Sequence, residues 1–207
     1  MSARVRAAAA AVEQLPADPG LLVLEYELER VALAEADDDA LEAWTVTVVH
    51  PGSVEDDEDA GEIGRMELVR LCPADGHSPA RAADDFGDTA ARVAAAVFDP
   101  ATGGYGKAFR AAVSGSEGDL LLVESVELDT EWSDVGLESA LVAEAIATLG
   151  RGCCAVVADE RAGDWGALGF TAFQDRVVLL DPARGAAPGL RAAGRKALAE
   201  LSAAYGA

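Results

Sequence analysis

The sequence predicts a mixed α/β (α+β) fold, in which an antiparallel meander of strands leads into a parallel strand–helix–strand unit. Residues 21–71 hold segments in which apolar and polar side chains alternate, as they do in half-buried strands. Residues 119–158 hold two short apolar runs on either side of a helical pattern. Because a helical crossover of this length suits parallel strands, the second segment predicts a strand–helix–strand unit.

The N-terminal part is predicted to contain a helix followed by the three strands of the meander. The helix covers residues 3–15 and is ended by Pro16 and the Pro19-Gly20 turn. The strands are expected at residues 21–34, 43–49 and 63–71. The acidic connection between the last two contains Asp57 and Asp59, but its spacing does not complete a calcium-binding loop, so no metal site is predicted.

Helical patterns fill the segment between the meander and the central unit. One helix is predicted over residues 80–98 and a shorter one over residues 107–113. The apolar side of the first is formed by Phe86, Ala90, Val93 and Val97. Beyond the central unit we expect a short helix around Trp165, a strand and a C-terminal helix, at residues 161–169, 176–180 and 190–205. In the last helix, Arg191, Arg195 and Glu200 are assigned to the solvent-exposed side.

The central unit carries the clearest pattern. Residues 120–123 are all apolar, and Val126 and Leu128 then alternate with acids, which predicts a strand that is more deeply buried at its start than at its end. A polar connection leads to a helix that begins at Leu137, and a second apolar strand follows at residues 153–158. The N–H groups and dipole at the start of such a helix form an anion-binding site. We therefore expect the functional site at this connection.

Composition limits the classes of protein that need to be considered. The chain has 207 residues, of which 51% are hydrophobic, enough for one core, and no apolar run approaches the roughly 20 residues of a membrane span. Its three cysteines do not form a disulfide framework, which indicates a reducing cytoplasm. Cys153 and Cys154 are neighbours on a strand and are expected to fill the core on opposite faces.

The charge balance is strongly acidic. Asp and Glu number 37 against 16 Lys and Arg, for a formal net charge of −21. This balance argues against nucleic acid, whose phosphates need a basic surface, and against anionic membranes. It favours a cationic substrate or a basic protein partner, although maintaining solubility is an alternative role for the charge. A homodimer is one assembly that the sequence allows.

Around the central unit the chain resembles the GNAT superfamily of N-acetyltransferases. The resemblance rests on the strand at 120–128, the loop around Trp132, Gly136-Leu137 at the helix start, the strand at 153–158 and the segment 165–170. It covers residues 119–182 closely and the earlier chain by the order of its elements. It implies a GNAT-like mixed sheet in a single domain over residues 1–207. Extra helices are expected in segments 1–20 and 187–207.

The resemblance also implies acetyl-CoA as the cofactor. In the family the loop reads Gln/Arg-x-x-Gly-x-Gly/Ala, and its backbone amides hold the pyrophosphate, while the pantetheine bonds to the central strand. Here Ser133 takes the Gln/Arg position, Gly136 matches the first glycine, and Glu138 takes the second glycine or alanine position. The implied cofactor-binding residues are Val126, Leu128, Ser133, Asp134, Val135, Gly136, Leu137 and Glu138. Carboxylates at Asp134 and Glu138 would repel phosphate, and capping of the helix is their alternative role.

Two acids on the central strand are candidates for the general base of acyl transfer, Glu124 and Glu127. They are an odd number of residues apart, so a regular strand would place them on opposite faces. The family often has a tyrosine as general acid near its last helix, where this chain has Trp165, Phe170 and Phe173.

Two functions are therefore expected from the sequence. The first is an acyl-CoA-dependent N-acyltransferase that acts on an amine of a small molecule or a protein. The second is a catalytically inactive GNAT-like domain that has lost acetyl-CoA binding and serves as a binding or regulatory module for a basic partner.

Overall fold

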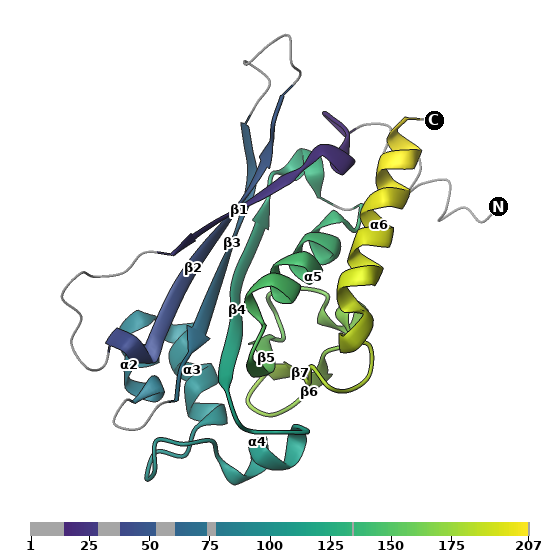
Figure 1. The fold of residues 1–207 in the computed structure, drawn as a ribbon. Helices are drawn as coiled ribbons and strands as arrows, with labels where there is room; N and C mark the ends of the chain where they lie inside the picture. The colour runs from purple at the N-terminus through teal and green to yellow at the C-terminus, as the bar shows by residue number, and fades with distance from the viewer. Residues whose placement is uncertain (1–14, 29–37, 53–60, 74–77, 134, 207) are drawn as a thin grey trace.

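The computed structural model describes residues 15–28, 38–52, 61–73, 78–133 and 135–206. Its centre is a seven-stranded sheet with the strand order β1-β2-β3-β4-β5-β7-β6 (Figure 1). The strands are β1 Val23–Leu28, β2 Leu41–His50, β3 Gly61–Leu71, β4 Asp119–Leu128, β5 Cys153–Asp159, β6 Thr171–Ala172 and β7 Val177–Leu180. Only the β4–β5 pair is parallel, and the other neighbouring pairs are antiparallel. This is the GNAT-like mixed sheet that the sequence predicts.

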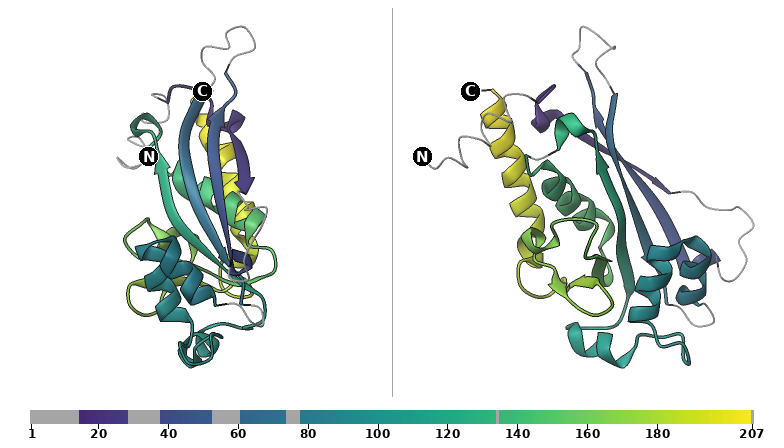
Figure 2. Two further views of the ribbon diagram at one scale, coloured as in Figure 1. Left: turned by 90° about the vertical axis from the view of Figure 1, so that its left-hand side faces the viewer. Right: turned by 180° about the vertical axis from the view of Figure 1, so that it is seen from behind.

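Helices cover the two faces of the sheet unequally (Figures 1 and 2). On one face lie α5 Leu137–Leu149 and α6 Leu190–Tyr205, and on the other lie α2 Pro79–Phe86, α3 Asp88–Val97 and α4 Lys107–Ala112. The apolar side chains form one buried cluster on each face. Figure 2 (right) shows α2 and α3 in front of one end of the strands, with no described helix in front of the other end of β2 and β3.

The register of the meander explains which face each side chain occupies. Tyr26, Val46, Met66 and Val126 lie opposite one another on four successive strands. Directly paired residues share a face of the sheet, and all four belong to the cluster beneath α5 and α6. The residues on either side of this row therefore project toward the other face.

Three predicted elements of this framework differ from the structure or extend beyond its described residues. The strand predicted at 21–34 is described only to Leu28, and the N-terminal helix predicted at 3–15 lies outside the described residues except for Leu15. The single helix predicted at 80–98 is wrong, because the chain is extended at Gly87 and forms α2 and α3 instead. Glycine is a poor helix former, and Asp88 supplies a favourable acid in the first turn of the new helix. As a result Phe86, predicted to face the core, is 40% exposed.

The two neighbouring cysteines follow the sequence prediction. Cys153 belongs to the cluster beneath α5 and Cys154 to the cluster on the opposite face. Burial raises the pKa of the Cys153 thiol to about 12 and raises that of Cys154 as well. Both thiols are therefore neutral core residues at physiological pH.

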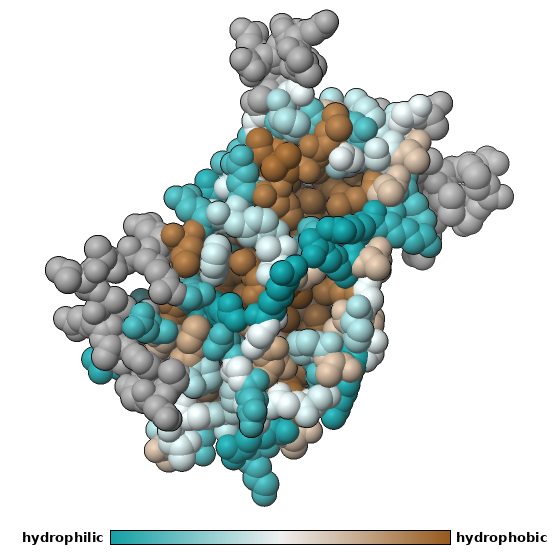
Figure 3. All heavy atoms as spheres, viewed as in Figure 1, coloured by the Kyte–Doolittle hydropathy of each residue, from teal (hydrophilic) through white to brown (hydrophobic). Residues whose placement is uncertain are grey.

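Helix α6 has the predicted bounds but is anchored by residues that the sequence assigned to solvent. Arg191 and Arg195 both donate hydrogen bonds to the carboxylate of Glu144 on α5. At Gly194 the two helices touch, since an added Cβ would lie 2.9 Å from the Cβ of Ala143. The ion pairs border a groove that is lined by residues of β1, α5 and α6. Figure 3 shows apolar residues in this region of the surface, with a band of hydrophilic residues beside them.

Replacing Glu144 with Gln is expected to destabilise the fold at pH 7 by about 1 kcal/mol, the upper end for a partly exposed ion pair. Partial burial alone would raise the pKa of Glu144, but hydrogen bonds from Arg191 and Arg195 outweigh it and the pKa is lowered. Its stabilising contribution is therefore present above the unfolded-state pKa and is lost as the pH falls through the folded-state pKa. Urea unfolding should show the destabilisation at pH 7, and the difference should shrink as the pH is lowered below the ordinary range of a glutamate.

The control for this prediction is Glu200→Gln on α6. Glu200 is 69% exposed, and its ion pair with Lys196 is long, at 3.7 Å. Its unfolding midpoint should stay at the wild-type value at both pH values. Equal effects of the two substitutions would show that Glu144 has no special anchoring role.

No helix within the described ranges combines the length and hydrophobicity that crossing a membrane requires.

Candidate functional site

The candidate site lies where β4 and β5 separate. The parallel pairing begins at Asp119 opposite Cys153 and ends at Val123 opposite Ala158. Strand β4 continues to Leu128 and stays paired with β3, whereas β5 ends at Asp159. In the described part of the chain, no strand pairs with residues 124–128 on the β5 side. Strands β4 and β5 are thus paired up to Val123 and separated beyond it. A cofactor that inserts between two strands would need such a separation.

The backbone of β4 offers hydrogen-bonding groups at this separation. The N–H of Asp129 donates to the carbonyl of Ile63 on β3, and the carbonyl oxygen of Glu127 faces Gly64, also on β3. Because successive residues of a strand direct their N–H and C=O groups to opposite sides, those of Val126 and Leu128 point away from β3. These are the two residues that the sequence predicts to hold the pantetheine.

A β-bulge at Glu124 changes the orientation of the candidate bases. Ser125 lies opposite Glu67 and Val123 opposite Leu68, so Glu124 is an extra residue in β4. Both Val123 and Val126 consequently face the cluster beneath α5. Glu124 and Glu127 therefore lie on the same face of the sheet, which α3 covers at Glu124 but not at Glu127, and the prediction that they lie on opposite faces is wrong.

Glu124 lies in a polar group formed by three other elements. It is near Glu67 on β3, Thr89 and Arg92 on α3, and Asp159 at the end of β5. Arg92 forms an ion pair with Asp159 and donates a further hydrogen bond to the carbonyl of Asp175 at 3.3 Å. The guanidinium is thus held by the end of β5 and a neighbouring turn.

One carboxylate oxygen of Glu124 lacks a hydrogen-bond partner. Its Oε2 atom is buried and has no hydrogen-bond partner. Burial raises the pKa of this carboxyl, a hydrogen bond with Thr89 acts in the opposite direction, and the charge of Glu67 adds to the rise. A carboxylate with a raised pKa and a vacant acceptor position is suited to take a proton from an amine.

Glu127 has a different environment. Its side chain is exposed, in an open depression that it shares with Glu62, Arg65 and Asp129. The structure therefore distinguishes the two candidate bases by burial.

At the start of α5 the backbone N–H groups favour an anion, whereas the nearby acidic side chains disfavour one. Gly136 has a left-handed conformation (φ 81°), and as the N-cap residue it provides no side-chain cap. Glu138 lies in the first turn, with its Oε1 beside Gly163. Partial burial, together with the charge of Asp164, raises the pKa of Glu138. Glu138, which the sequence predicts at this site, and Asp164, which it does not, therefore both lie near the start of α5.

Three of the other predicted loop residues, Ser133, Val135 and Leu137, have structural roles. The hydroxyl of Ser133 donates to the carbonyl of Thr130 at 2.8 Å, so it closes its own turn. Val135 and Leu137 pack against the apolar cluster, and only their backbone groups are available to a ligand. Asp134 lies outside the described residues.

Two tryptophans fix the loops around the separation. Trp132 is buried, and its ring centroid lies 6.2 Å from that of His50. Trp165 is also buried and donates from Nε1 to the carbonyl of Asp159 at 2.6 Å. The three tyrosines are Tyr26 on β1, Tyr205 at the C-terminal end of α6, and Tyr105, whose hydroxyl donates to the carbonyl of Gly118 before β4.

Sequence reasoning missed four residues of the polar group, namely Glu67, Thr89, Arg92 and Asp159. Asp159 had a usable signal, because it directly follows a buried strand whose carboxyl end lies at the site. The bulge also had a signal, since the apolar residues Val123 and Val126 are three positions apart and break the alternation of the strand. Thr89 and Arg92 had none, because their helix meets β4 only in the folded chain.

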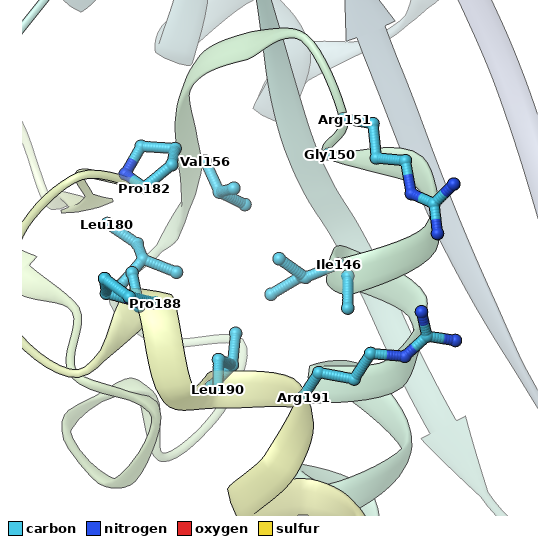
Figure 4. Close-up of a pocket in the computed structure, with 11 residues that line it drawn as sticks. Ile146, Gly150, Arg151, Val156, Leu180, Pro182, Pro188, Leu190 and Arg191 are labelled. Carbon is cyan, nitrogen blue, oxygen red and sulfur yellow. The ribbon is translucent and has the colours of Figure 1, made fainter.

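A separate cavity lies at the other end of the strand–helix–strand unit (Figure 4). It measures about 210 Å³, and its apolar lining includes Ile146, Val156, Leu180 and Leu190. It also borders Gly150 and Arg151, which precede β5, whereas the separation of the strands lies at the carboxyl end of β5. This cavity is therefore not part of the candidate site. Within the described residues, no group of His, Cys, Asp and Glu could hold a metal ion.

The strand order, the single parallel pair and its separation beyond Val123 place the chain in the class of GNAT-like mixed sheets. No family model matches the sequence, and no curated protein matches it. Among solved structures, a mutant of KacT is 11% identical, with a TM-score of 0.40 over 76% of this chain and 77% of its own.

Two structures of AtaT are similar to the same degree. A mutant AtaT toxin bound to the C-terminus of the antitoxin AtaR is 11% identical, with a TM-score of 0.39 over 82% of this chain and 97% of its own. AtaT complexed with acetyl-methionyl-tRNAfMet is 13% identical, with a TM-score of 0.39 over 77% and 95%. At these values the likeness transfers neither substrate nor partner to this chain, and the fold class rests on its own strand order.

Proposed function

We propose that this protein is an acyl-CoA-dependent N-acyltransferase that transfers an acetyl group to an amine of a small molecule or a protein. The observation that carries this proposal is the separation of β4 and β5 beyond Val123. On one side of β4 it leaves the backbone groups of Val126 and Leu128 available, and beside it lies the carboxyl group of Glu124, whose Oε2 has no hydrogen-bond partner.

Acetyl-CoA would be held chiefly by backbone groups of this chain. Val126 and Leu128 would bond to the pantetheine, and the N–H groups at the start of α5 would face the pyrophosphate. Backbone contacts of this kind do not depend on the side chains that differ from the family pattern. Bound acetyl-CoA would supply an activated thioester whose sulfur can leave as a thiolate.

Glu124 would act on the acceptor. Its carboxylate would take one proton from the ammonium group, which would free the nitrogen lone pair to form the C–N bond with the acetyl carbon as the C–S bond breaks. The nitrogen would then lose a second proton, and the departing thiolate would take up a proton to leave as the thiol. Arg92 is held by Asp159 near Glu124, and we propose that it limits the rise in the pKa of this base.

Specific observations favour the second function, a GNAT-like domain that has lost the cofactor. Glu138 and Asp164 place two acids at the tip of α5, where the phosphates would bind. The loop that could carry a catalytic tyrosine carries Trp165 instead, and its Nε1 is already bonded to Asp159. These features oppose binding of an anion and stabilisation of a thiolate, respectively.

Titration calorimetry with acetyl-CoA decides between the two functions. We expect binding in the micromolar to millimolar range, and CoA release in the presence of a mixture of amines. An absence of heat at millimolar acetyl-CoA would overturn the enzyme proposal and favour the binding module.

Replacing Glu138 with Gln is expected to tighten acetyl-CoA binding about tenfold, because it removes a carboxylate about 5 Å or more from the expected phosphates in a partly screened environment. Calorimetry at low ionic strength would measure the change, and it should shrink as salt is added. Glu117→Gln, an exposed site before β4, is the control and should leave the affinity unaltered. If Glu138→Gln behaves like this control, the pyrophosphate does not bind at the tip of α5.

A further inference from the structure

The cavity at the C-terminal end of α5 is a second place where a small molecule can bind (Figure 4). Its walls come from the last turn of α5, the middle of β5, the end of β7 and the segment that leads into α6. Helix α5 has 13 residues, so its two ends lie about 20 Å apart. The cavity is therefore distant from the first turn of α5, where the proposed function places the pyrophosphate.

The interior of the cavity is apolar. The side chains of Ile146, Val156, Leu180 and Leu190 point into it from α5, β5, β7 and α6 (Figure 4). All four belong to the hydrophobic cluster beneath α5 and α6, and each is at most 6% exposed. Because side chains of a packed core have fixed positions, the cavity is already formed without a ligand.

The volume of the cavity limits the size of its ligand. It measures about 210 Å³, whereas an engineered apolar cavity of about 150 Å³ holds one benzene molecule. In the same proportion, this cavity has room for about eight carbon atoms. Sites for drug-sized ligands measure about 300 Å³ or more, so a ligand of that size is too large.

The charges beside the cavity are positive. Among the described residues that line it, the only charged ones are Arg151, directly after α5, and Arg191, in the first turn of α6. Both guanidinium groups lie on the same side of the cavity (Figure 4). The chain as a whole has 37 acids against 16 bases, so this lining reverses the average charge of the protein. It is complementary to an apolar ligand with a negative head group.

Arg151 is the cation that is available to such a head group. Arg191 is already held by Glu144, to which its Nε donates at 2.9 Å. The side chain of Arg151 is exposed, and within the described part of the chain its guanidinium has no hydrogen bond or ion pair. Its backbone is fixed, because the carbonyl of Arg151 accepts a hydrogen bond from Arg70 at 2.8 Å. One guanidinium matches the two oxygens and single charge of a carboxylate.

We propose that this cavity binds a medium-chain aliphatic carboxylate of about eight carbons. Its chain would lie among the four apolar side chains, and its carboxylate would contact Arg151. This inference is independent of the proposed acyl transfer, because it concerns a different site and a different ligand.

Titration calorimetry of the full chain with sodium octanoate, below its micelle-forming concentration, tests the proposal. We expect binding in the micromolar to millimolar range. The affinity should rise about fourfold for each methylene added between hexanoate and octanoate. It should level off between octanoate and dodecanoate, because the cavity is then full. A rise that continues unchanged through dodecanoate would indicate adsorption to open apolar surface and would overturn the proposal.

Two substitutions separate the roles of the head group and the chain. Arg151→Gln should weaken octanoate binding about three- to fivefold, the effect of one exposed ion pair, and leave the affinity for octan-1-ol unaltered. Ala147→Leu enlarges a side chain in the wall of the cavity and should weaken binding of both molecules at least tenfold. Ala147 is partly exposed, so the helix can accommodate leucine, and thermal unfolding confirms that each variant is folded.

Arg110→Gln is the matched control, because it removes the same charge from an exposed position on α4, across the sheet from the cavity. It should bind octanoate with wild-type affinity. Equal losses in Arg151→Gln and Arg110→Gln would show only an effect of net charge and would overturn the proposal, as would absence of octanoate binding to the wild type at millimolar concentration.

Competition with acetyl-CoA separates this inference from the proposed function. Saturating acetyl-CoA should leave octanoate binding unchanged, since the two sites lie at opposite ends of α5. Displacement of octanoate by acetyl-CoA would place octanoate between β4 and β5 and would overturn the proposal. If octanoate binds with the expected response to Arg151→Gln and acetyl-CoA does not bind, the carboxylate site stands and the enzyme proposal fails.

Discussion

Replacing Glu124 with Gln is expected to lower kcat/KM for acetyl transfer by about a hundredfold to ten-thousandfold, the usual contribution of a general base. Acetyl-CoA affinity should stay at the wild-type value, because the proposed cofactor contacts lie on the backbone of Val126 and Leu128. The pKa of Glu124 is raised, above all by burial. Wild-type activity should therefore fall as the pH drops through a value above that of an ordinary glutamate. The variant should lack this inflection.

The same substitution should not destabilise the protein at neutral pH. A carboxyl with a raised folded-state pKa contributes stability when protonated, and this contribution is lost as the pH rises through that pKa. Charged Glu124, with its buried and unpartnered Oε2, is therefore a destabilising group at pH 7. We expect the variant to unfold at the wild-type temperature or a few degrees above it, which would separate loss of activity from loss of fold.

Glu127→Gln is the matched control, because it lies on the same strand and face but is exposed. It should retain wild-type turnover with a small amine. Comparable losses in both variants, or near-normal activity of Glu124→Gln, would remove Glu124 from the role of base.

Replacing Phe109 with Ala is expected to cost about 3–5 kcal/mol of unfolding free energy, the usual result of emptying a buried aromatic position. Phe109 is fully buried in α4; its ring stacks on Tyr105 at 4.7 Å and meets the edge of Phe173 at 6.2 Å. The hydroxyl of Tyr105 in turn donates to the carbonyl of Gly118, directly before β4. Urea unfolding measures the loss.

Phe86 provides a control of the same residue type. It is 40% exposed at the end of α2, so Phe86→Ala should change the unfolding free energy by less than about 0.5 kcal/mol. A cost for Phe109→Ala as small as that of the control would show that α4 does not anchor this face of the sheet.

The elements that local patterns define were predictable. The crossover between β4 and β5, the bounds of α6 and the opposite orientations of Cys153 and Cys154 follow from periodicity alone. Periodicity failed where one residue interrupts it. Gly87 divides a predicted helix, and the bulge at Glu124 moves the candidate bases onto one face.

The position of Val126 and Leu128 was predicted through the family resemblance, whereas the availability of their backbone groups follows from the register of β4 with β3. The loop residue Ser133 could not be assigned from sequence, because its hydroxyl forms a bond within its own turn. The acid at Asp164 was not foreseen, since it reaches Glu138 from a different loop.

The sequence by itself determined the order of strands and helices, the acidic balance and the strand that carries the candidate bases. Only the tertiary structure decided that Arg92 holds Asp159 beside Glu124, that Arg191 and Arg195 hold Glu144, and that acids from β1, β3 and β4 share one face of the sheet. The physical reason is range. Periodicity reports which side of an element is buried, whereas a charged side chain takes its partner from whichever distant segment the packing of the core brings beside it.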